Sequence, residues 1–145
     1  MTAWIKRRPW LACALLAFLL RLSLAVTTEF KPIFPPYYYT DAAIVDKYAW
    51  QTVSMDKSQE ASFSQMTQTF VLSMVYRVFG HRPLAAKILN AGLASGAIIL
   101  AAGMIEPVFG TAAALVSCLA IALWPSHIFF TSQNFKDAQV IFALF

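Results

Sequence analysis

Apolar stretches alternate with polar ones along this chain, and their lengths set the predicted elements. Residues 10–26, 84–104 and 108–124 are long enough, or nearly so, to cross a bilayer as helices, since a crossing takes about 20 apolar residues. A further apolar stretch, residues 136–145, reaches the last residue without the polar cap or turn residue that normally ends a helix. We therefore expect an all-α integral membrane protein with three crossings and part of a fourth, truncated from a longer multi-pass protein.

Residues 27–83 separate the first crossing from the second and hold five of the seven acidic side chains. A helix is predicted to begin at Thr40 or Asp41, because Thr is a good cap and Asp favours the positive end of the helix dipole. Apolar side chains at every fourth position predict a second helix over residues 65–79: Met66, Phe70, Met74 and Val78. That spacing is typical of an amphipathic helix at a membrane surface, so we expect a long external loop that carries two interfacial helices.

The composition agrees with a membrane protein. Apolar residues make up 59% of the chain and charged residues 12%, whereas a soluble domain is typically about 25% charged. The net charge of +4 comes partly from Lys6, Arg7 and Arg8, which predict a cytoplasmic N-terminus by the positive-inside rule. The sequence has no basic stripe with interleaved aromatic residues, so nucleic acid is not an expected partner.

The cysteines and histidines do not predict a metal site. Cys13 and Cys118 lie in apolar stretches without a ligand neighbour at a suitable spacing, which is typical of buried small apolar residues. His81 and His127 are far apart and belong to no HExxH-type motif. No cofactor is evident from the sequence.

Arg21 is the only charged residue of the first crossing. It disfavours a cleaved secretory signal, in which a charge so late in the apolar region is unusual. An arginine at this depth either extends its side chain to the membrane surface or faces a polar cavity or an anionic headgroup. Both interpretations stay open from the sequence.

The cations near the second crossing depart from the positive-inside rule. The turn expected at Glu106-Pro107 would be cytoplasmic but carries no Lys or Arg, whereas Arg77, Arg82 and Lys87 would lie outside. The rule weights the first helix most heavily, so the predicted topology stands. An anionic partner on the outer side would account for the three cations.

The order and spacing of several short segments resemble a known class of membrane enzymes. They are Arg21 near the end of the first crossing, Pro35-Pro36, Asp41 with Tyr48-Ala49-Trp50, Gln68-Thr69-Phe70 through Gly80, Lys87 through Asn90, and Trp124-Pro125-Ser126 through Ala138. Together they resemble the polyprenyl-phosphate-sugar glycosyltransferases of the GT-C class. The most similar members are bacterial and resemble protein O-mannosyltransferases and lipid A aminoarabinose transferases. The resemblance covers nearly the whole chain from Trp10 onward.

The resemblance implies a catalytic acid in the first external loop, and Asp41 matches its position. The family commonly has a second acid there, which Ala42 replaces in this chain. Asp46, just over one helical turn later, is the alternative base. Without the resemblance, Asp41 at a helix start is simply a good cap.

The resemblance also implies that Asp137 faces the same external cavity and helps to position a substrate, although an Asp at a helix start also suits the dipole. Four cations are candidates for contact with the donor phosphate: Lys136, Arg77, Arg82 and Lys87. Anionic lipid headgroups are the simpler partners for the last three.

The function implied by the resemblance is transfer of a sugar from a polyprenyl-phosphate donor at the outer face of a bacterial inner membrane. The acceptor would be a lipid, a glycan or a protein hydroxyl. The class varies in its need for a divalent metal, so the resemblance leaves that need open. The alternative is a non-enzymatic membrane protein, such as a transporter fragment or an assembly subunit. Transporters place charged groups at the membrane midplane, whereas the acids here cluster in the external loop.

Overall fold

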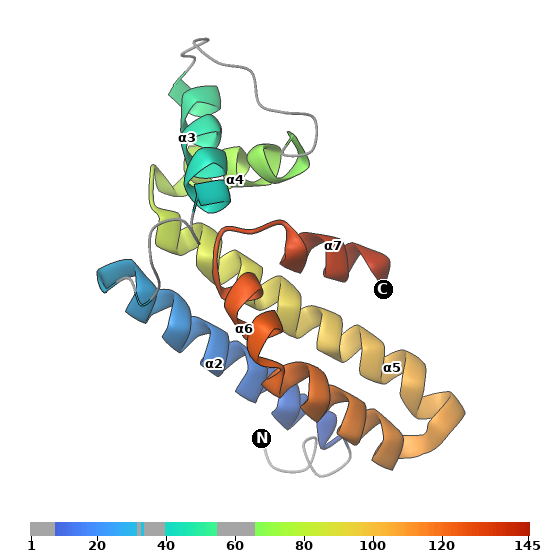
Figure 1. The fold of residues 1–145 in the computed structure, drawn as a ribbon. Coiled ribbons are helices and arrows are strands. Elements are labelled where there is room, and N and C mark those ends of the chain that lie inside the picture. Colours follow the sequence, from blue (N-terminus) through green and yellow to red (C-terminus); the bar gives the residue numbers. More distant parts are fainter. Residues whose placement is uncertain (1–7, 32, 34–39, 55–65) are drawn as a thin grey trace.

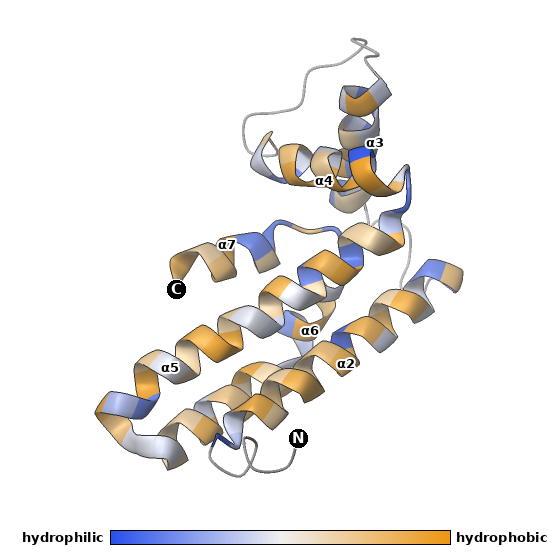
Figure 2. Cartoon of the chain, turned by 180° about the vertical axis from the view of Figure 1, so that it is seen from behind, coloured by the Kyte–Doolittle hydropathy of each residue, from blue (hydrophilic) through white to orange (hydrophobic). Residues whose placement is uncertain are grey.

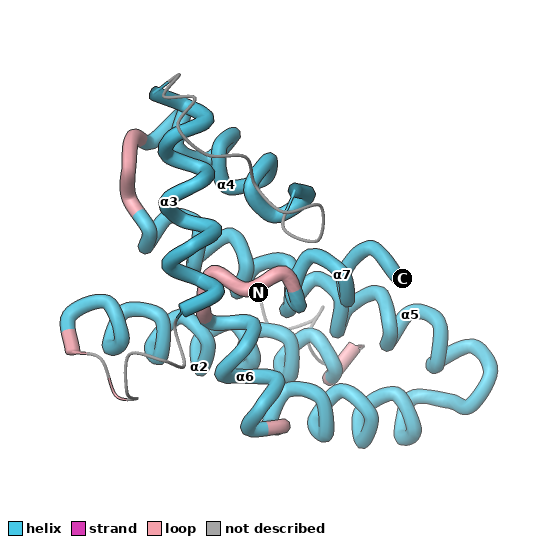
Figure 3. The backbone as a smooth tube through the Cα atoms, turned by 45° about the horizontal axis from the view of Figure 1, so that its top comes forward, coloured by secondary structure: helices cyan, strands magenta, loops and turns pink. Residues whose placement is uncertain are grey.

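The computed structural model describes residues 8–31, 33, 40–54 and 66–145, and every element within these ranges is a helix (Figures 1 and 3). The predicted all-α class is therefore confirmed for this part of the chain. The Pro35-Pro36 pair and the basic residues Lys6 and Arg7 lie outside the described residues. The helices are α2 (Trp10–Phe30), α3 (Thr40–Ser54), α4 (Met66–Phe79), α5 (Pro83–Leu123), α6 (Pro125–Ser132) and α7 (Asp137–Leu144).

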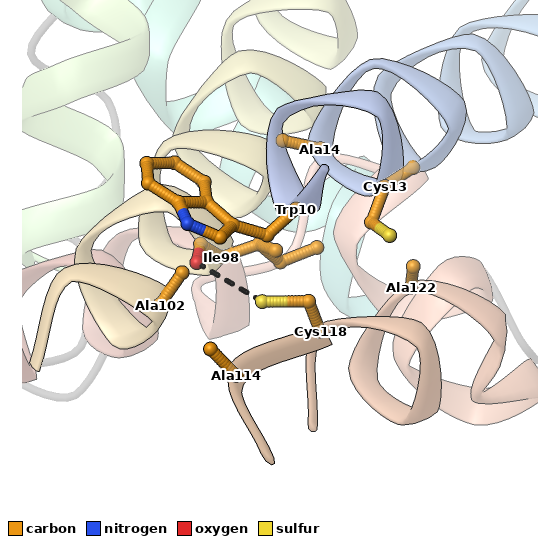
Figure 4. Packing of buried hydrophobic residues seen from close by; sticks show 9 residues of the cluster. Trp10, Cys13, Ala14, Ile98, Ala102, Ala114, Cys118 and Ala122 are labelled. Carbon is orange, nitrogen blue, oxygen red and sulfur yellow. Dashed lines mark hydrogen bonds between the residues drawn. The ribbon is translucent and has the colours of Figure 1, made fainter. Parts of the chain in front are cut away.

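Helices α2 and α5 form the main bundle, in which α2 lies along the folded-back α5 (Figure 1). Small side chains fill the contact, because Ala17 and Ala102 are fully buried while the larger Leu15 and Leu16 point outward. Both cysteines are free and buried, as predicted, and the Cys118 Sγ lies 3.7 Å from the Ile98 carbonyl oxygen (Figure 4). Small residues allow close helix approach, which is the usual device where helices meet in a membrane.

The chain reverses direction inside α5 at Gly110, and the predicted turn at Glu106-Pro107 is displaced. Gly110 has φ 82° and ψ 168°, a conformation that a side chain would strain, whereas Pro107 stays within the helix. Proline fixes φ near −65°, which is a helical value. Glu106 accepts hydrogen bonds from the Trp10 indole at 3.0 Å and from the Thr111 hydroxyl at 2.8 Å. These bonds join the start of α2 to the reversal of α5.

Helix α7 lies against the first half of α5 (Figure 1). A Cβ atom added at Gly96 would stand 3.0 Å from the Phe142 ring, so this glycine makes room for the aromatic side chain. A small residue thus allows close helix packing at Gly96. At Gly92, in contrast, an added Cβ would meet nothing within 4 Å.

Helices α3 and α4 form a second unit beyond one end of the main bundle (Figure 1). The helix starts predicted at residues 40 and 65 agree with the structure to within one residue. The core of this unit joins Val45 and Ala49 of α3 to Leu72 and Tyr76 of α4, with Ala86 at the base. Residues 55–65, between the two helices, lie outside the described residues.

Helix α4 exposes its apolar side and buries polar side chains. The predicted stripe is solvent-accessible, with Met66 57%, Phe70 59%, Met74 45% and Val78 75% exposed. The opposite side buries the polar Gln68, Thr69 and Ser73 beside the core residues Leu72 and Tyr76. A surface helix of a water-soluble domain normally turns its charged and polar side outward, so the exposed apolar stripe needs a non-aqueous surrounding or a partner.

Helices α2 and α5 are long and apolar enough to cross a membrane (Figure 2). Only 33% of the most apolar window of α2 and 44% of that of α5 is buried inside the structure. A core helix of a soluble protein is mostly buried instead. The arrangement is therefore compatible with a membrane protein.

Candidate functional site

Asp41 and Asp137 are far apart in the sequence but line the same cavity. It has a volume of about 360 Å³ and is also lined by Lys136 and Gln68, with Val45, Phe130 and Phe135 completing the wall. Asp41 is in the first turn of α3, and Asp137 is the first residue of α7. The fold therefore brings three of the predicted site residues together at the end of the bundle that carries α3 and α4.

The segment between α6 and α7 is held by side chains that bond its backbone carbonyl groups. The Asn90 amide of α5 donates to the Gln133 carbonyl oxygen at 2.7 Å and to that of Phe135 at 3.3 Å. The Gln68 amide of α4 donates to the Asn134 carbonyl oxygen. A buried carbonyl without water needs such a donor. These bonds fix the backbone that carries Lys136 and Asp137 into the cavity.

Asp46 is engaged by two neighbours and does not line this cavity. Its carboxylate accepts a hydrogen bond from the buried Tyr76 hydroxyl, and its other oxygen lies 3.0 Å from the His81 Nε2. Trp50 stacks on His81 with ring centroids 4.9 Å apart. Burial first, then the hydrogen bond to Asp46, raises the pKa of Tyr76 well above its ordinary value. This arrangement gives Asp46 a structural role in joining α3 to the α4–α5 corner.

The remaining cations occupy different surroundings. Lys87 is buried and forms an ion pair with Glu29 at 2.8 Å, so its charge is already compensated within the fold. Lys87 and Glu29 line a second cavity of about 280 Å³, together with Asp46. Arg77 is exposed in the last turn of α4, and Arg82 is exposed at the N-cap of α5.

Arg21 does not extend to the surface. It is fully buried, and its guanidinium donates to the Thr131 hydroxyl at 2.8 Å and to the Ala17 carbonyl oxygen at 3.0 Å. Its Nη2 lies 2.6 Å from the His127 Nδ1. The interpretation in which the Arg21 side chain extends to the membrane surface is therefore wrong, because α6 supplies polar partners inside the bundle. The sequence alone could not place α6 beside α2.

Sequence reasoning missed two residues that line cavities. Gln68 appeared only within the resembling segments, and no local signal marked it as buried, because a polar residue opposite an apolar stripe is normally expected to face solvent. His127 was considered only as a metal ligand, yet it lines a cavity of about 340 Å³ with Asp137. Within the described residues, no group of three or more His, Cys, Asp or Glu side chains could hold a metal ion.

The chain matches no protein-family model, no curated protein sequence and no solved structure.

Proposed function

We propose that the chain forms part of a membrane glycosyltransferase that takes a sugar from a polyprenyl-phosphate donor at the outer face of a bacterial inner membrane. The observation that supports this most is the cavity that Asp41 and Asp137 line together with Lys136. It combines two carboxylates with one cation at the edge of an apolar bundle. The proposed transfer needs a carboxylate as base and a cation near the departing phosphate.

In this proposal Asp41 is the general base that orients the acceptor hydroxyl and removes its proton. The hydroxyl oxygen forms a bond to the anomeric carbon, and the bond from that carbon to the phosphate oxygen breaks with inversion. Lys136 stabilises the negative charge that develops on the departing lipid phosphate. Asp137 positions the acceptor or the sugar. Asp46 is less suited to the role of base, because Tyr76 and His81 already bond its carboxylate.

The exposed stripe of α4 supports a location at the membrane surface. Its side chains Met66, Phe70, Met74 and Val78 would lie among the lipid tails. Arg77 and Arg82, both exposed, would contact anionic headgroups or the donor phosphate. In this arrangement the N-terminus is cytoplasmic, residues 27–83 are external, and α3 holds Asp41 above the lipid.

The experiment is sugar transfer in membranes that carry the protein expressed from its complete gene, with a polyprenyl-phosphate sugar as donor. Asp41→Asn should lower turnover about 100-fold or more, the usual loss for a general base. Lys136→Gln should mainly raise the KM for the donor. Glu106→Gln is the matched carboxylate control, since Glu106 lies close to the Gly110 reversal and does not line the candidate cavity. Normal turnover by Asp41→Asn would remove Asp41 from the mechanism.

A non-enzymatic membrane protein is the second candidate, and the buried Arg21 favours it. A charge in the middle of an apolar helix is typical of transport pathways as well as of structural networks. Transfer by the wild-type protein, lost in Asp41→Asn and kept in Glu106→Gln, would exclude this candidate.

A further inference from the structure

The pair formed by Arg21 and His127 lies directly behind a cavity that the proposed reaction does not use. This cavity, about 340 Å³, is lined mostly by apolar side chains: Ile121, Trp124, Phe130 and Ile141, with Ser126, His127 and Asp137 as the polar members. It adjoins the candidate site, because Phe130 and Asp137 line both cavities. A ligand here would be apolar over most of its surface.

The contact between the two side chains fixes the proton position on the imidazole. A guanidinium has only donors and keeps its charge in proteins. At 2.6 Å from the Arg21 Nη2, the His127 Nδ1 must therefore be the acceptor. The proton of the neutral ring is then on Nε2. Among the described residues, the His127 Nε2 is not one of the buried polar atoms that lack a partner.

The surroundings of His127 keep the ring neutral. Burial lowers its pKa, and the positive charge of Arg21 on α2 lowers it further. The Ile121 carbonyl on α5 and the Asp137 carboxylate on α7 oppose this shift as smaller effects. A protonated ring would lose the acceptor that Arg21 uses and would place two cations side by side.

We infer that Arg21 is a positioning residue that holds His127 as a neutral donor, and that its Nε2–H binds an oxygen acceptor of an apolar ligand in this cavity. The ligand class is an amphiphile with an alkyl or isoprenoid body and a hydroxyl, ether or phosphate oxygen near one end. The inference concerns binding alone and does not require the proposed sugar transfer.

The tautomer is measured first, by ¹⁵N NMR of the imidazoles in the full protein in nanodiscs. The chain has only two histidines, so His81→Asn assigns the signals. The wild type should give the Nε2–H form of His127 at neutral pH. Arg21→Met should give a mixture of tautomers and a His127 that protonates at higher pH, and Arg21→Lys should restore the Nε2–H form in part. An Nδ1–H form in the wild type would overturn the inference.

Binding is measured with bromododecanol as the probe and bromododecane as its matched control, both in nanodiscs. Bromine quenches tryptophan, and Trp124 lines the cavity, so Trp124→Phe isolates the relevant signal. The wild type should bind the alcohol about fivefold more tightly than the bromoalkane, the ratio expected from one net hydrogen bond. Equal affinities for the two probes would overturn the inference.

Two variants of His127 separate its two nitrogen positions. Asn carries its amide near the place of Nδ1, so His127→Asn keeps the contact with Arg21 and should lose the preference for the alcohol. Gln reaches the place of Nε2, so His127→Gln should keep much of the preference. The reverse pattern would contradict the assignment of the proton to Nε2.

If the Asn variant does not fold, the tautomer of the wild type and the binding preference of the Gln variant decide the question. Loss of sugar transfer without change in these readouts would count against the proposed enzyme only.

Discussion

Helices α3 and α4 pack against each other but present opposite chemistry to their surroundings. The outward residues of α3 include Asp41, Lys47 and Thr52, which suit water. The outward side of α4 is the stripe of Met and Phe residues with Val78. The two helices therefore suit different surroundings: water for the outward side of α3, and a non-aqueous phase or a protein partner for the outward side of α4. Asp41 belongs to the outward, polar residues of α3.

The first test compares the two sides of α4 and should give the largest effect. Leu72 is fully buried in the α3–α4 core, so Leu72→Ala should destabilise this unit by about 2–5 kcal/mol. Phe70→Ala, on the exposed stripe, should change the stability by less than about 0.5 kcal/mol in detergent. Hydrogen exchange of the α4 amides measures both. Equal losses would mean that the stripe is packed against something in the folded protein.

The second test extends the comparison to the main bundle. Ala17 is fully buried in the contact of α2 with α5, whereas Leu16 is 40% exposed. Ala17→Leu should destabilise the bundle by about 1–3 kcal/mol, because the added atoms separate the helices. Leu16→Ala should be nearly neutral. Unfolding by denaturant in detergent micelles gives both values, and a larger loss from Leu16→Ala would contradict the helix orientation.

The third test concerns the Tyr76 hydroxyl, which ties α4 to Asp46 of α3. Tyr76→Phe should cost about 0.5–1.5 kcal/mol at neutral pH, the value of one net hydrogen bond. Because the pKa of Tyr76 is raised in the folded state, its contribution is present below about pH 10 and is lost as the pH rises further. Denaturation curves should therefore show a difference in stability between the wild type and Tyr76→Phe at pH 7 and a smaller difference at about pH 11. Parallel curves at both pH values would exclude this ionisation.

The sequence predicted the helices better than it predicted their partners. Apolar length and the four-residue spacing were enough for α2 and α4, because both are local signals. The reversal at Gly110 was misplaced by a few residues, since Glu106-Pro107 has turn-forming composition but a proline can remain helical. The backbone conformation of a glycine decided the position.

The site could be predicted only in part, for a physical reason. Asp41 and Asp137 were found as acids at helix starts, which is a local feature. The bonds beside the two cavities that Asp137 lines join distant segments: Gln68 reaches Asn134, and Arg21 reaches His127. The first bond depends on how α4 lies against the segment between α6 and α7, and the second depends on how α6 packs on α2. No periodicity in one segment encodes either contact. For the same reason the sequence could not decide between the two interpretations of Arg21.

The last test asks directly which phase each helix faces and should leave stability almost unchanged. Spin labels at Met74→Cys and Thr52→Cys report collisions with oxygen, which partitions into lipid, and with a nickel chelate, which stays in water. The native cysteines are buried and should label poorly. In nanodiscs, the α4 label should collide more with oxygen and the α3 label more with nickel. If both labels collide mainly with nickel, α4 does not lie in lipid. The apolar stripe would then need a protein partner, and the proposed membrane position of the candidate site would fail with it.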